Sequence, residues 1–494
     1  MNLLVDRKLG KTILHLAYPI TIAMLTQTAI TLADTMMVGR LSTEWSIAGQ
    51  SAIGISLILL WASGGLIASI GVGTQAIAAR RFGAGEFKKA GQVLDNAVLI
   101  ALVLSIAATI AIISTLPDFF PYLHSNPRVI ELGLEYCTYR MYGMGSMALT
   151  IVFKGFFDGI GRTKVHMTAA ILMNIVNIAL NYSLIFGVGP FPQMHVAGAG
   201  LASLIATFVG LIVMVYFAAE KGNRKKFSLF HLSSFDFKVG WNVVKLGLPG
   251  GMATVFVMTG FGAFITIVSW LDADIIRAAV AQAPAFDSIS VGAFVAKPSE
   301  IWNASLYEQI YKDNPPIYTA ATKVIMDAMQ VIFMTAIAFG QATATLVSQS
   351  MGSGNPDQAE RYGWESVKLG IYILGSVGLF MVLFPDMVSG AFNPDKSVIA
   401  AGHTSLMLMG AGSIFIAAGM ILSQALFGAG HTMFVMVAEA ILHFFCLIPV
   451  AYLFGVYWSG GMVGIWSAAL LYVALLAVVM VIKFYRGGWK TTQI

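Results

Sequence analysis

Apolar stretches, each about as long as a membrane-spanning helix, recur along the whole chain. A helix needs about 20 apolar residues to cross a bilayer. Stretches of this length are separated by short clusters of charged and turn-forming residues, as at 80–89 and 220–226. The pattern predicts twelve transmembrane helices, at residues 13–38, 50–79, 93–115, 133–157, 165–187, 196–219, 242–270, 319–348, 366–384, 404–427, 433–456 and 462–483.

Composition narrows the class of protein. Of the 494 residues, 57% are hydrophobic and 11% are charged, whereas a soluble domain has about 25% charged residues. The mean hydropathy is +0.79. These values predict an all-α integral membrane protein and exclude a soluble enzyme. The two cysteines, Cys137 and Cys446, lie in apolar stretches and are too few for a disulfide framework or a zinc site.

The distribution of basic residues predicts the orientation in the membrane. Cytoplasmic segments of membrane proteins are enriched in Lys and Arg. The side of the predicted bundle that carries both termini holds 21 of the 29 Lys and Arg residues, and the opposite side holds 8. We therefore expect both termini in the cytoplasm. The first apolar stretch has basic flanks but no small-residue cleavage motif, so we expect a retained helix and not a signal peptide.

An internal repeat relates the two halves of the chain. Three pairs of short segments match at almost the same offset: 82–85 with 351–354 (351 − 82 = 269), 159–163 with 428–432 (428 − 159 = 269), and 116–118 with 384–386 (384 − 116 = 268). Each pair follows the corresponding helix of its half, which predicts two homologous six-helix lobes in a parallel repeat about an axis along the membrane normal. The predicted lobes span 1–225 and 242–494, with a cytoplasmic linker at 226–241.

The second half also contains an insertion. The first helices of the halves, at 16–19 and 246–249, match at a smaller offset (246 − 16 = 230), and the difference from the later offset is 39 (269 − 230). The extra residues belong to a predicted external loop at about 271–318. A loop of this length is expected to be a lid or a partner surface, although long insertions without a role are also tolerated.

A polar stripe lies on the first predicted helix. Gln27, Thr31 and Asp34 fall at i, i+4 and i+7, so they share one helix face. An ionised Asp facing lipid costs about 2.5–3.5 kcal/mol. The stripe is therefore expected to face the bundle interior or a water-filled cavity, where Asp34 is a candidate functional residue. The alternative is a buried acid satisfied by neighbouring helices.

A second polar stripe lies on the fifth predicted helix. Asn174, Asn177 and Asn181 fall at i, i+3 and i+7, and Asn181 lies at the same predicted depth as Asp34. A carboxylate with amide oxygens suits Na⁺, and a carboxyl group in a low-dielectric pocket suits a proton carrier. The sequence leaves the two ions open. The alternative is a set of hydrogen bonds that hold helices together. Tyr136, Tyr139 and Ser203 are further candidates for the same site.

Two acids lie inside apolar segments of the second half. Asp327 has Gln330 at i+3, and Glu439 has His443 at i+4. Each pair is a candidate for a second titratable site, to which an ion that drives transport could bind, or for a substrate anchor. An acid beside His, as at Glu439 and His443, can relay protons near neutral pH. Gln27, Thr31 and Asn174 are candidates for the same secondary roles. The alternatives are a mutually satisfied buried pair for Glu439 and a helix-end surface acid for Asp327.

Several motifs in this order resemble those of the multidrug and toxic compound extrusion (MATE) transporters. The similarity covers nearly the whole chain except the insertion. It is carried by four segments: Leu-Ala-Asp34-Thr-Met-Met-Val-Gly39, Arg81-Phe-Gly-Ala-Gly85, Gly155-Phe-Phe-Asp-Gly-Ile-Gly161-Arg-Thr163 and Asn177-Ile-Ala-Leu-Asn181-Tyr-Ser-Leu-Ile-Phe-Gly187.

The resemblance implies a V-shaped pair of lobes around a cavity that alternates between the two membrane faces. It also implies export of organic, often cationic, compounds in exchange for H⁺ or Na⁺, with the ion bound at Asp34, Asn177 and Asn181. Some branches of the family carry further acids in the seventh and tenth helices. Residues 250–271 and 404–427 contain no Asp or Glu, so that second coupling site is expected to be absent.

We therefore predict a monomeric secondary antiporter in the cytoplasmic membrane, in contact with lipid. Its partners are expected to be small organic compounds and not nucleic acid. No nucleotide-binding Gly-rich motif and no catalytic constellation occurs in the sequence, so we expect neither an enzyme nor any cofactor beyond the coupling ion. The main alternative is a lipid-linked-oligosaccharide or natural-product flippase of the same superfamily. A membrane-embedded enzyme or receptor is a more distant alternative.

Overall fold

A computed structural model describes residues 4–123, 127–231, 234–281 and 313–492. Within these ranges, side chains are not described at 29–35, 43–44, 47, 55, 57–59, 61–63, 66, 122–123 and 280–281. The described residues are helical almost throughout and include no strand. The all-α prediction is confirmed.

The first half of the chain forms one bundle, called the N-lobe below. Its first helix begins after Asp6, whose carboxylate accepts hydrogen bonds from the Lys8 and Leu9 amides at 2.9 and 3.2 Å, a typical N-terminal cap. The helices of the N-lobe are α1 (Arg7–Gly39), α2 (Thr43–Gly83), α3 (Phe87–Leu123), α4 (Pro127–Tyr142), α5 (Met144–Gly159), α6 (Thr163–Phe186), α7 (His195–Ala219) and α8 (Lys221–Phe227).

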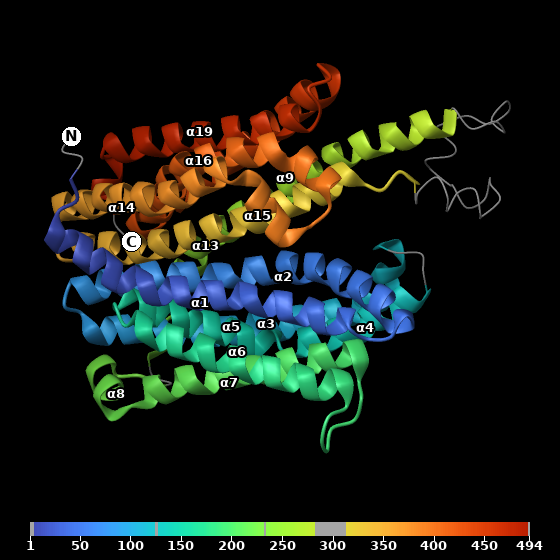
Figure 1. The fold of residues 1–494 in the computed structure, drawn as a ribbon. Helices are drawn as coiled ribbons and strands as arrows, with labels where there is room; N and C mark the ends of the chain where they lie inside the picture. Colours follow the sequence, from blue (N-terminus) through green and yellow to red (C-terminus); the bar gives the residue numbers. More distant parts are fainter. Residues whose placement is uncertain (1–3, 124–126, 232–233, 282–312, 493–494) are drawn as a thin grey trace.

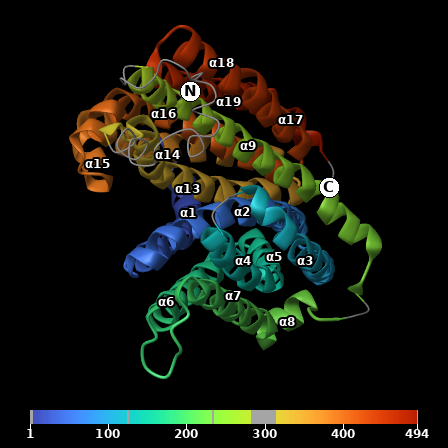
Figure 2. The ribbon, with the colours of Figure 1, turned by 90° about the vertical axis from the view of Figure 1, so that its right-hand side faces the viewer.

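The second half forms the C-lobe. Its helices are α9 (Phe237–Ala281), α13 (Ile317–Gly352), α14 (Pro356–Leu383), α15 (Pro385–Phe392), α16 (Lys396–Ala429), α17 (Thr432–Leu442), the π-helix η2 (His443–Leu447), α18 (Ile448–Tyr452), the π-helix η3 (Leu453–Tyr457), α19 (Gly461–Tyr485) and the short 3₁₀ turn η4 (Gly488–Thr491). The two lobes lie side by side, and both chain termini lie at one end of the bundle (Figures 1 and 2). This end is called the terminal end below.

The predicted membrane spans all coincide with helices. Among the described residues, 10 helices are long and apolar enough to cross a membrane. The two remaining predicted spans correspond to α2 and to the α4–α5 pair, which is interrupted at Gly143. Side chains that point away from the bundle, such as Ile110, Ile212 and Phe445, are large, apolar and exposed, as lipid-facing residues are. The protein is a multi-pass membrane protein.

Close contacts between backbones follow the repeat. A Cβ atom at Gly83 would lie 2.0 Å from the Gln349 carbonyl oxygen, and one at Gly352 would lie 2.0 Å from the Arg80 carbonyl oxygen. The two contacts are related by the repeat offset, since 352 − 83 and 349 − 80 both equal 269. Only glycine fits where two helices approach this closely. The parallel repeat is therefore visible as a symmetric crossing of α2 and α13.

Helix α1 packs against both lobes. Ile13, Ala17 and Ile20, in its first half, belong to a buried cluster with α13 residues such as Ile325. Val38, near its end, belongs to a different cluster with residues of the N-lobe helices α4, α6 and α7. The sequence assigned α1 to the N-lobe alone, because periodicity identifies the buried faces of a helix but not its partners.

Two segments expected to be irregular are partly helical. Helix α9 begins at Phe237, inside the predicted linker, and continues to Ala281, inside the predicted external loop. Residues 282–312 of that loop lie outside the described residues. Asp272, which was expected in the loop, is buried on α9. Its carboxylate accepts hydrogen bonds from the Tyr318 and Thr319 amides at 2.9 and 2.8 Å, and so caps α13.

Candidate functional site

The predicted asparagine stripe is buried on one face of α6. Asn174, Asn177 and Asn181 are 5%, 3% and 0% exposed. Helix α6 packs against α1 on one side and α7 on the other. The i, i+3, i+7 spacing therefore places all three amides inside the N-lobe, as predicted.

Hydrogen bonds join this stripe to α7. The Asn181 Nδ2 group donates to Asn177 Oδ1 at 2.9 Å, and the Asn177 Nδ2 group donates to Ser203 Oγ at 3.2 Å. Neither polar atom of the Asn174 side chain has a hydrogen-bond partner among the described side chains. Buried amides without partners are uncommon and often face an ion or a water molecule. Ser203, a candidate from the sequence, thus belongs to the cluster.

The α1 stripe is placed by its backbone. Val38 lies in one buried cluster with Ile185 of α6 and Tyr136 of α4. Positions 34 and 181 are each one turn before Val38 and Ile185 on their helices. The side chains of Thr31 and Asp34 lie outside the described residues, and that of Gln27 is exposed. The match in depth between Asp34 and Asn181 stays a prediction.

A second polar cluster lies in the C-lobe. The Tyr472 hydroxyl of α19 donates to Glu439 Oε2 at 2.8 Å. His443 Nδ1 lies 2.9 Å from the Glu439 backbone oxygen and 3.5 Å from Oε2. Glu439, His443 and Tyr472 are 9%, 0% and 6% exposed. The i, i+4 spacing correctly predicted that Glu439 and His443 meet, whereas Tyr472 was missed because it lies on another helix.

Asp327, the other acid predicted in the second half, has a different environment. Its carboxylate pairs with Lys323, one turn earlier on α13, and the Lys323 side chain is 68% exposed. Asp327 is therefore neutralised by a lysine near the surface and does not join the Glu439 cluster. A surface pair of this kind contributes little to stability.

A third polar group, which the sequence interpretation missed, lies near the terminal end. Asp158 is fully buried at the end of α5, and His166 Nδ1 of α6 lies 3.3 Å from its Oδ2. Asp158 is part of the segment 155–163, which the sequence relates to the repeat and to the MATE transporters without assigning this acid a role. The acid was overlooked because its partner follows across a turn and not on the same helix.

Hydrogen bonds between the lobes lie beside this pair. Thr345 Oγ1 of α13 donates to the Asp158 carbonyl oxygen at 3.0 Å and accepts from Gln75 Nε2 of α2 at 2.9 Å. Gln349 Nε2 donates to the Gly159 carbonyl oxygen at 2.7 Å, and Ser348 Oγ donates to that of Ala76 at 2.7 Å. Together with the Gly83–Gly352 crossing, these bonds hold the lobes together at the terminal end.

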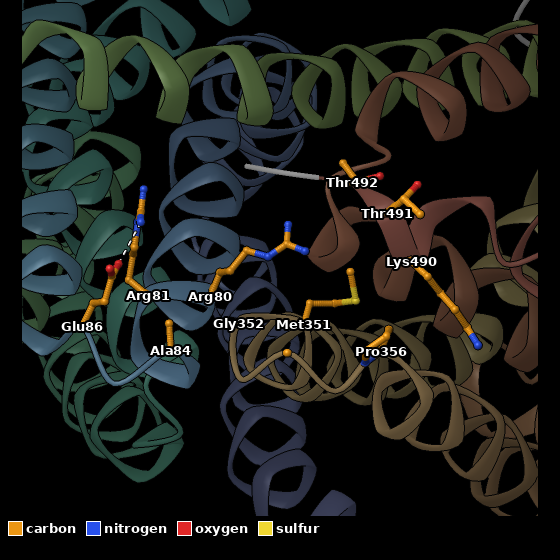
Figure 3. A pocket seen from close by; sticks show the side chains of 11 residues that line it. Arg80, Arg81, Ala84, Glu86, Met351, Gly352, Pro356, Lys490, Thr491 and Thr492 are labelled. Atoms are coloured by element: carbon orange, nitrogen blue, oxygen red, sulfur yellow. Dashed lines mark hydrogen bonds and ion pairs between the residues drawn. The ribbon is translucent and has the colours of Figure 1, made fainter.

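A hollow of about 500 Å³ opens beside the helix crossing (Figure 3). Arg80, Arg81 and Lys490 give it a basic lining. Arg81 pairs with Glu86 at 2.8 Å, and Lys490 pairs with Glu360 at 2.6 Å. The hollow lies at the terminal end, next to the α2–α3 turn, and contains none of the predicted site residues.

The two buried clusters differ in the chemical groups that they contribute. No group of three or more His, Cys, Asp or Glu side chains that could hold a metal ion occurs among the described residues. The α6–α7 cluster offers amide and hydroxyl groups, which bind hard cations through oxygen. The C-lobe cluster offers a carboxyl group and an imidazole, which exchange protons.

Known proteins resemble the chain over nearly its whole length. The sequence matches the MatE family over residues 19–183 and 313–453, together more than half of the chain. It is 23% identical to the probable multidrug resistance protein NorM of Thermotoga maritima, covering 98% of this chain and 94% of that protein. It is 24% identical to the protein of the same name from Mesorhizobium japonicum, covering 96% and 93%.

Solved structures share the fold. A crystal structure of a MATE transporter in the straight conformation superposes with a TM-score of 0.82 at 20% identity, covering 98% of this chain and 97% of the other. A MOP superfamily transporter from Pyrococcus furiosus, described as having a binding pocket of reverse polarity that suggests a different function, superposes with a TM-score of 0.81 at 20% identity and the same coverage. The two-lobe helical fold is common to these proteins.

Proposed function

Because this chain belongs to the MatE family of transporters, we propose that it is a secondary active antiporter that exports small organic compounds, many of them cationic, in exchange for H⁺ or Na⁺. Family membership, the multi-pass helical fold and the relatives named multidrug resistance proteins support multidrug efflux. In this proposal, the lobes alternate between states that open the substrate path to one membrane face at a time.

The observation that carries the proposal is the buried chain of Ser203, Asn177 and Asn181. In this proposal, Asn181 lies at the depth of Asp34. Polar groups buried among apolar helices are costly unless they are satisfied or functional. An Asp in α1 facing amides in α6 would supply a charge that a proton or Na⁺ neutralises, and amide and hydroxyl oxygens would complete the shell of Na⁺.

Helix α1 offers a connection between ion binding and movement of the lobes. Its first half packs in the core of the C-lobe, and Val38, near its end, belongs to a buried cluster with Ile185, one turn beyond Asn181 in the N-lobe. A rearrangement at the cluster would therefore act on the contact between the lobes. The hydrogen bonds at the terminal end support an arrangement that is closed at this end.

The proposal is tested by efflux of a fluorescent cationic dye from proteoliposomes under an imposed Na⁺ or pH gradient. Wild type is compared with Asp34→Asn and with Asp274→Asn, a control that removes an exposed acid paired with Arg277 at 2.6 Å. We expect one gradient to drive efflux in wild type and in the control, and Asp34→Asn to lose it. If neither gradient drives dye efflux in wild type, the antiporter proposal is wrong and the flippase alternative gains support.

A further inference from the structure

The polar cluster of the C-lobe occupies the repeat position of the asparagine cluster. The repeat offset relates Asn174 to His443 (443 − 174 = 269) and Ser203 to Tyr472 (472 − 203 = 269). In each lobe, a hydrogen bond crosses between the equivalent helix pair, from Asn177 to Ser203 in one and from Tyr472 to Glu439 in the other. The same place in the fold therefore holds a polar cluster twice.

The acidic residue lies on different helices in the two lobes. The smaller offset that relates the first helices of the halves places Phe264 of α9 at the position of Asp34 in α1 (264 − 34 = 230). Phe264 is fully buried, and its ring packs against Trp466 at 5.1 Å. The C-lobe thus has a phenyl ring where the N-lobe has an acid, and it carries its own acid on α17.

Among the described side chains, no Lys or Arg pairs with Glu439. Within the described residues, the one side chain at ion-pair distance from the Glu439 carboxylate is His443. The helices packed around this cluster contribute Tyr472 from α19 and the apolar Gly260 and Phe261 from α9, and Cys446 of η2 lies near Tyr472.

A basic group lies near the start of α17. Lys483 of α19 lies over the ring of Phe434 at 4.7 Å. Phe434 is in the first turn of α17, more than one turn before Glu439. An ionised carboxylate without a nearby cation is costly inside a membrane protein.

The hydrogen bond of His443 to the Glu439 backbone oxygen orients its ring for accepting a proton. The contact of 2.9 Å with the Glu439 carbonyl oxygen assigns the hydrogen to Nδ1. In the neutral ring, Nε2 is then an acceptor, and it is buried without a hydrogen-bond partner among the described residues. The ring fits because residue 260 is glycine: a Cβ there would lie 2.5 Å from His443 Cδ2. A π-helix begins at His443, and such segments are frequent at functional sites.

From this geometry, we propose that Glu439, His443 and Tyr472 form a proton-binding site in the C-lobe, separate from the ion site of the N-lobe. A proton from water forms an O–H bond with the Glu439 carboxylate or an N–H bond with His443 Nε2, and it returns to water when the bond breaks. Tyr472 orients the carboxylate by its donated hydrogen bond. The use of this proton in the transport cycle rests on the proposed function, whereas proton binding itself does not.

Proton binding is tested by infrared difference spectra of the purified full-length protein in lipid, recorded between alkaline and acidic pH. We expect wild type to gain the carbonyl stretching band of a protonated carboxylic acid, and Glu439→Gln to lose a component of it. The matched control is Glu131→Gln, which removes an exposed glutamate paired with Arg128 at 2.6 Å and so leaves that component in place. An unchanged carboxyl band in Glu439→Gln, together with unchanged imidazole bands in His443→Gln, would overturn the proposal.

A second variant covers the case in which Glu439→Gln does not fold. Tyr472→Phe removes only the hydroxyl and keeps the ring against His443, which lies 4.4 Å away between centroids. We expect the Glu439 band to remain but to appear at a different pH. If the variant titrates as wild type does, Tyr472 does not orient the acid and the three-residue site is wrong.

Measurements of proton and dye transport distinguish a failure of the proton site from a failure of the proposed antiport. In proteoliposomes under a pH gradient, Glu439→Gln is expected to move fewer protons per dye molecule than wild type while dye binding persists. An unchanged proton count would contradict a role of the site in the cycle. If wild type transports no dye but Glu439→Gln still loses its infrared band, the proposed function fails and the proton site stands.

Discussion

The two lobes bury polar side chains at equivalent places but build them from different chemistry. In the N-lobe, the α6–α7 pair contributes amides and a hydroxyl, namely Asn177, Asn181 and Ser203. In the C-lobe, the equivalent pair contributes a carboxyl group, an imidazole and a phenol. The backbone scaffold is retained closely enough that the repeat-related glycines, Gly83 and Gly352, make the same helix crossing.

The difference shows that two repeated halves can keep the same helix packing while their acidic residues lie on different helices. Small residues at helix crossings are restricted by backbone contact, so both copies retain them. A buried acid needs only a face directed into the bundle, and neighbouring helices offer several. The candidate acid of the N-lobe site is therefore on α1, and that of the C-lobe cluster is on α17.

The largest effect is expected from Asn181→Leu, which breaks the N-lobe cluster. The change leaves the Asn177 Oδ1 acceptor buried without its donor, which costs about 1–3 kcal/mol, and removes an ion ligand of the proposed site. Gradient-driven dye efflux in proteoliposomes is expected to fall to background. Ser183→Ala, an exposed position on the same helix, is the control. Wild-type efflux in Asn181→Leu would show that coupling does not use this cluster.

The next largest effect is expected from Thr345→Val, at the contact between the lobes. The change removes the bond to the Asp158 carbonyl oxygen and the bond from Gln75. Two hydrogen bonds contribute about 1–3 kcal/mol, so the closed population at the terminal end should fall roughly 5- to 150-fold relative to the open one.

The closed population at the terminal end can be measured by spin labels at positions 88 and 353, one in each lobe, because the distance between the labels changes when the lobes separate. Thr266→Val is the control, because its hydroxyl bonds only to the Gly262 carbonyl oxygen within α9. Identical distance distributions in Thr345→Val and in the control would contradict a closing role for these bonds.

A smaller effect is expected from removing the hydroxyl groups at the repeat-related positions 203 and 472, by Ser203→Ala and Tyr472→Phe. Each removes one buried hydrogen bond, which contributes about 0.5–1.5 kcal/mol. Ser203→Ala should therefore lose roughly two- to tenfold in apparent ion affinity, measured by efflux against ion concentration. Tyr472→Phe should instead bind its proton more tightly by a similar factor, because the bond that Tyr472 donates stabilises the ionised Glu439 carboxylate. We expect the double variant to show both single effects unchanged, because distant sites are additive. A deviation of more than threefold would mean that the two lobes do not bind their ions independently.

The smallest effect is expected at the turns that end α2 and α13. Glu86 pairs with Arg81 and Lys89, whereas its counterpart Asn355 caps α14 through the Gln358 amide at 3.1 Å. Hydrogen bonds from Lys89 and Arg81 lower the pKa of Glu86 below its ordinary value. The stabilisation is therefore complete above pH about 4.3, the ordinary value, and is lost as the pH falls through the lowered pKa.

Because the Glu86 pair is partly exposed, Glu86→Gln should cost less than about 1 kcal/mol near neutral pH. The cost should vanish in acid, as measured by the thermal unfolding midpoint. Asn355→Ala, its counterpart, should cost the same at both pH values, since no ionised group is lost. A pH-independent cost of Glu86→Gln would contradict the ion-pair interpretation.

Features that depend on local spacing could be predicted from the sequence. Apolar length identifies the helices, the positions of glycine identify the repeat, and helical periodicity places Asn174, Asn177 and Asn181 on one buried face. The i, i+4 spacing likewise brings His443 to Glu439. Each of these signals lies within one helix or in the comparison of two short segments.

Features that depend on contacts between helices could not be predicted in the same way. Tyr472 reaches Glu439 from α19, and His166 reaches Asp158 across the α5–α6 turn. Helix α9 continues through charged residues because Asp272 caps α13 and Asp274 pairs with Arg277. The repeat offers one further signal, since its offset relates Ser203 to Tyr472.

The cap that Asp272 provides for α13 also explains how halves of unequal length keep one fold. Its carboxylate ties α9 to the Tyr318 and Thr319 amides and closes the base of the inserted segment. Beyond a closed base, chain length has little thermodynamic weight, since each doubling of a loop costs only about 0.6 kcal/mol. The helices on either side of 282–312 are thus tied to each other directly, and we expect this position to accept new sequence, including a reporter of membrane sidedness, without a change in those helices.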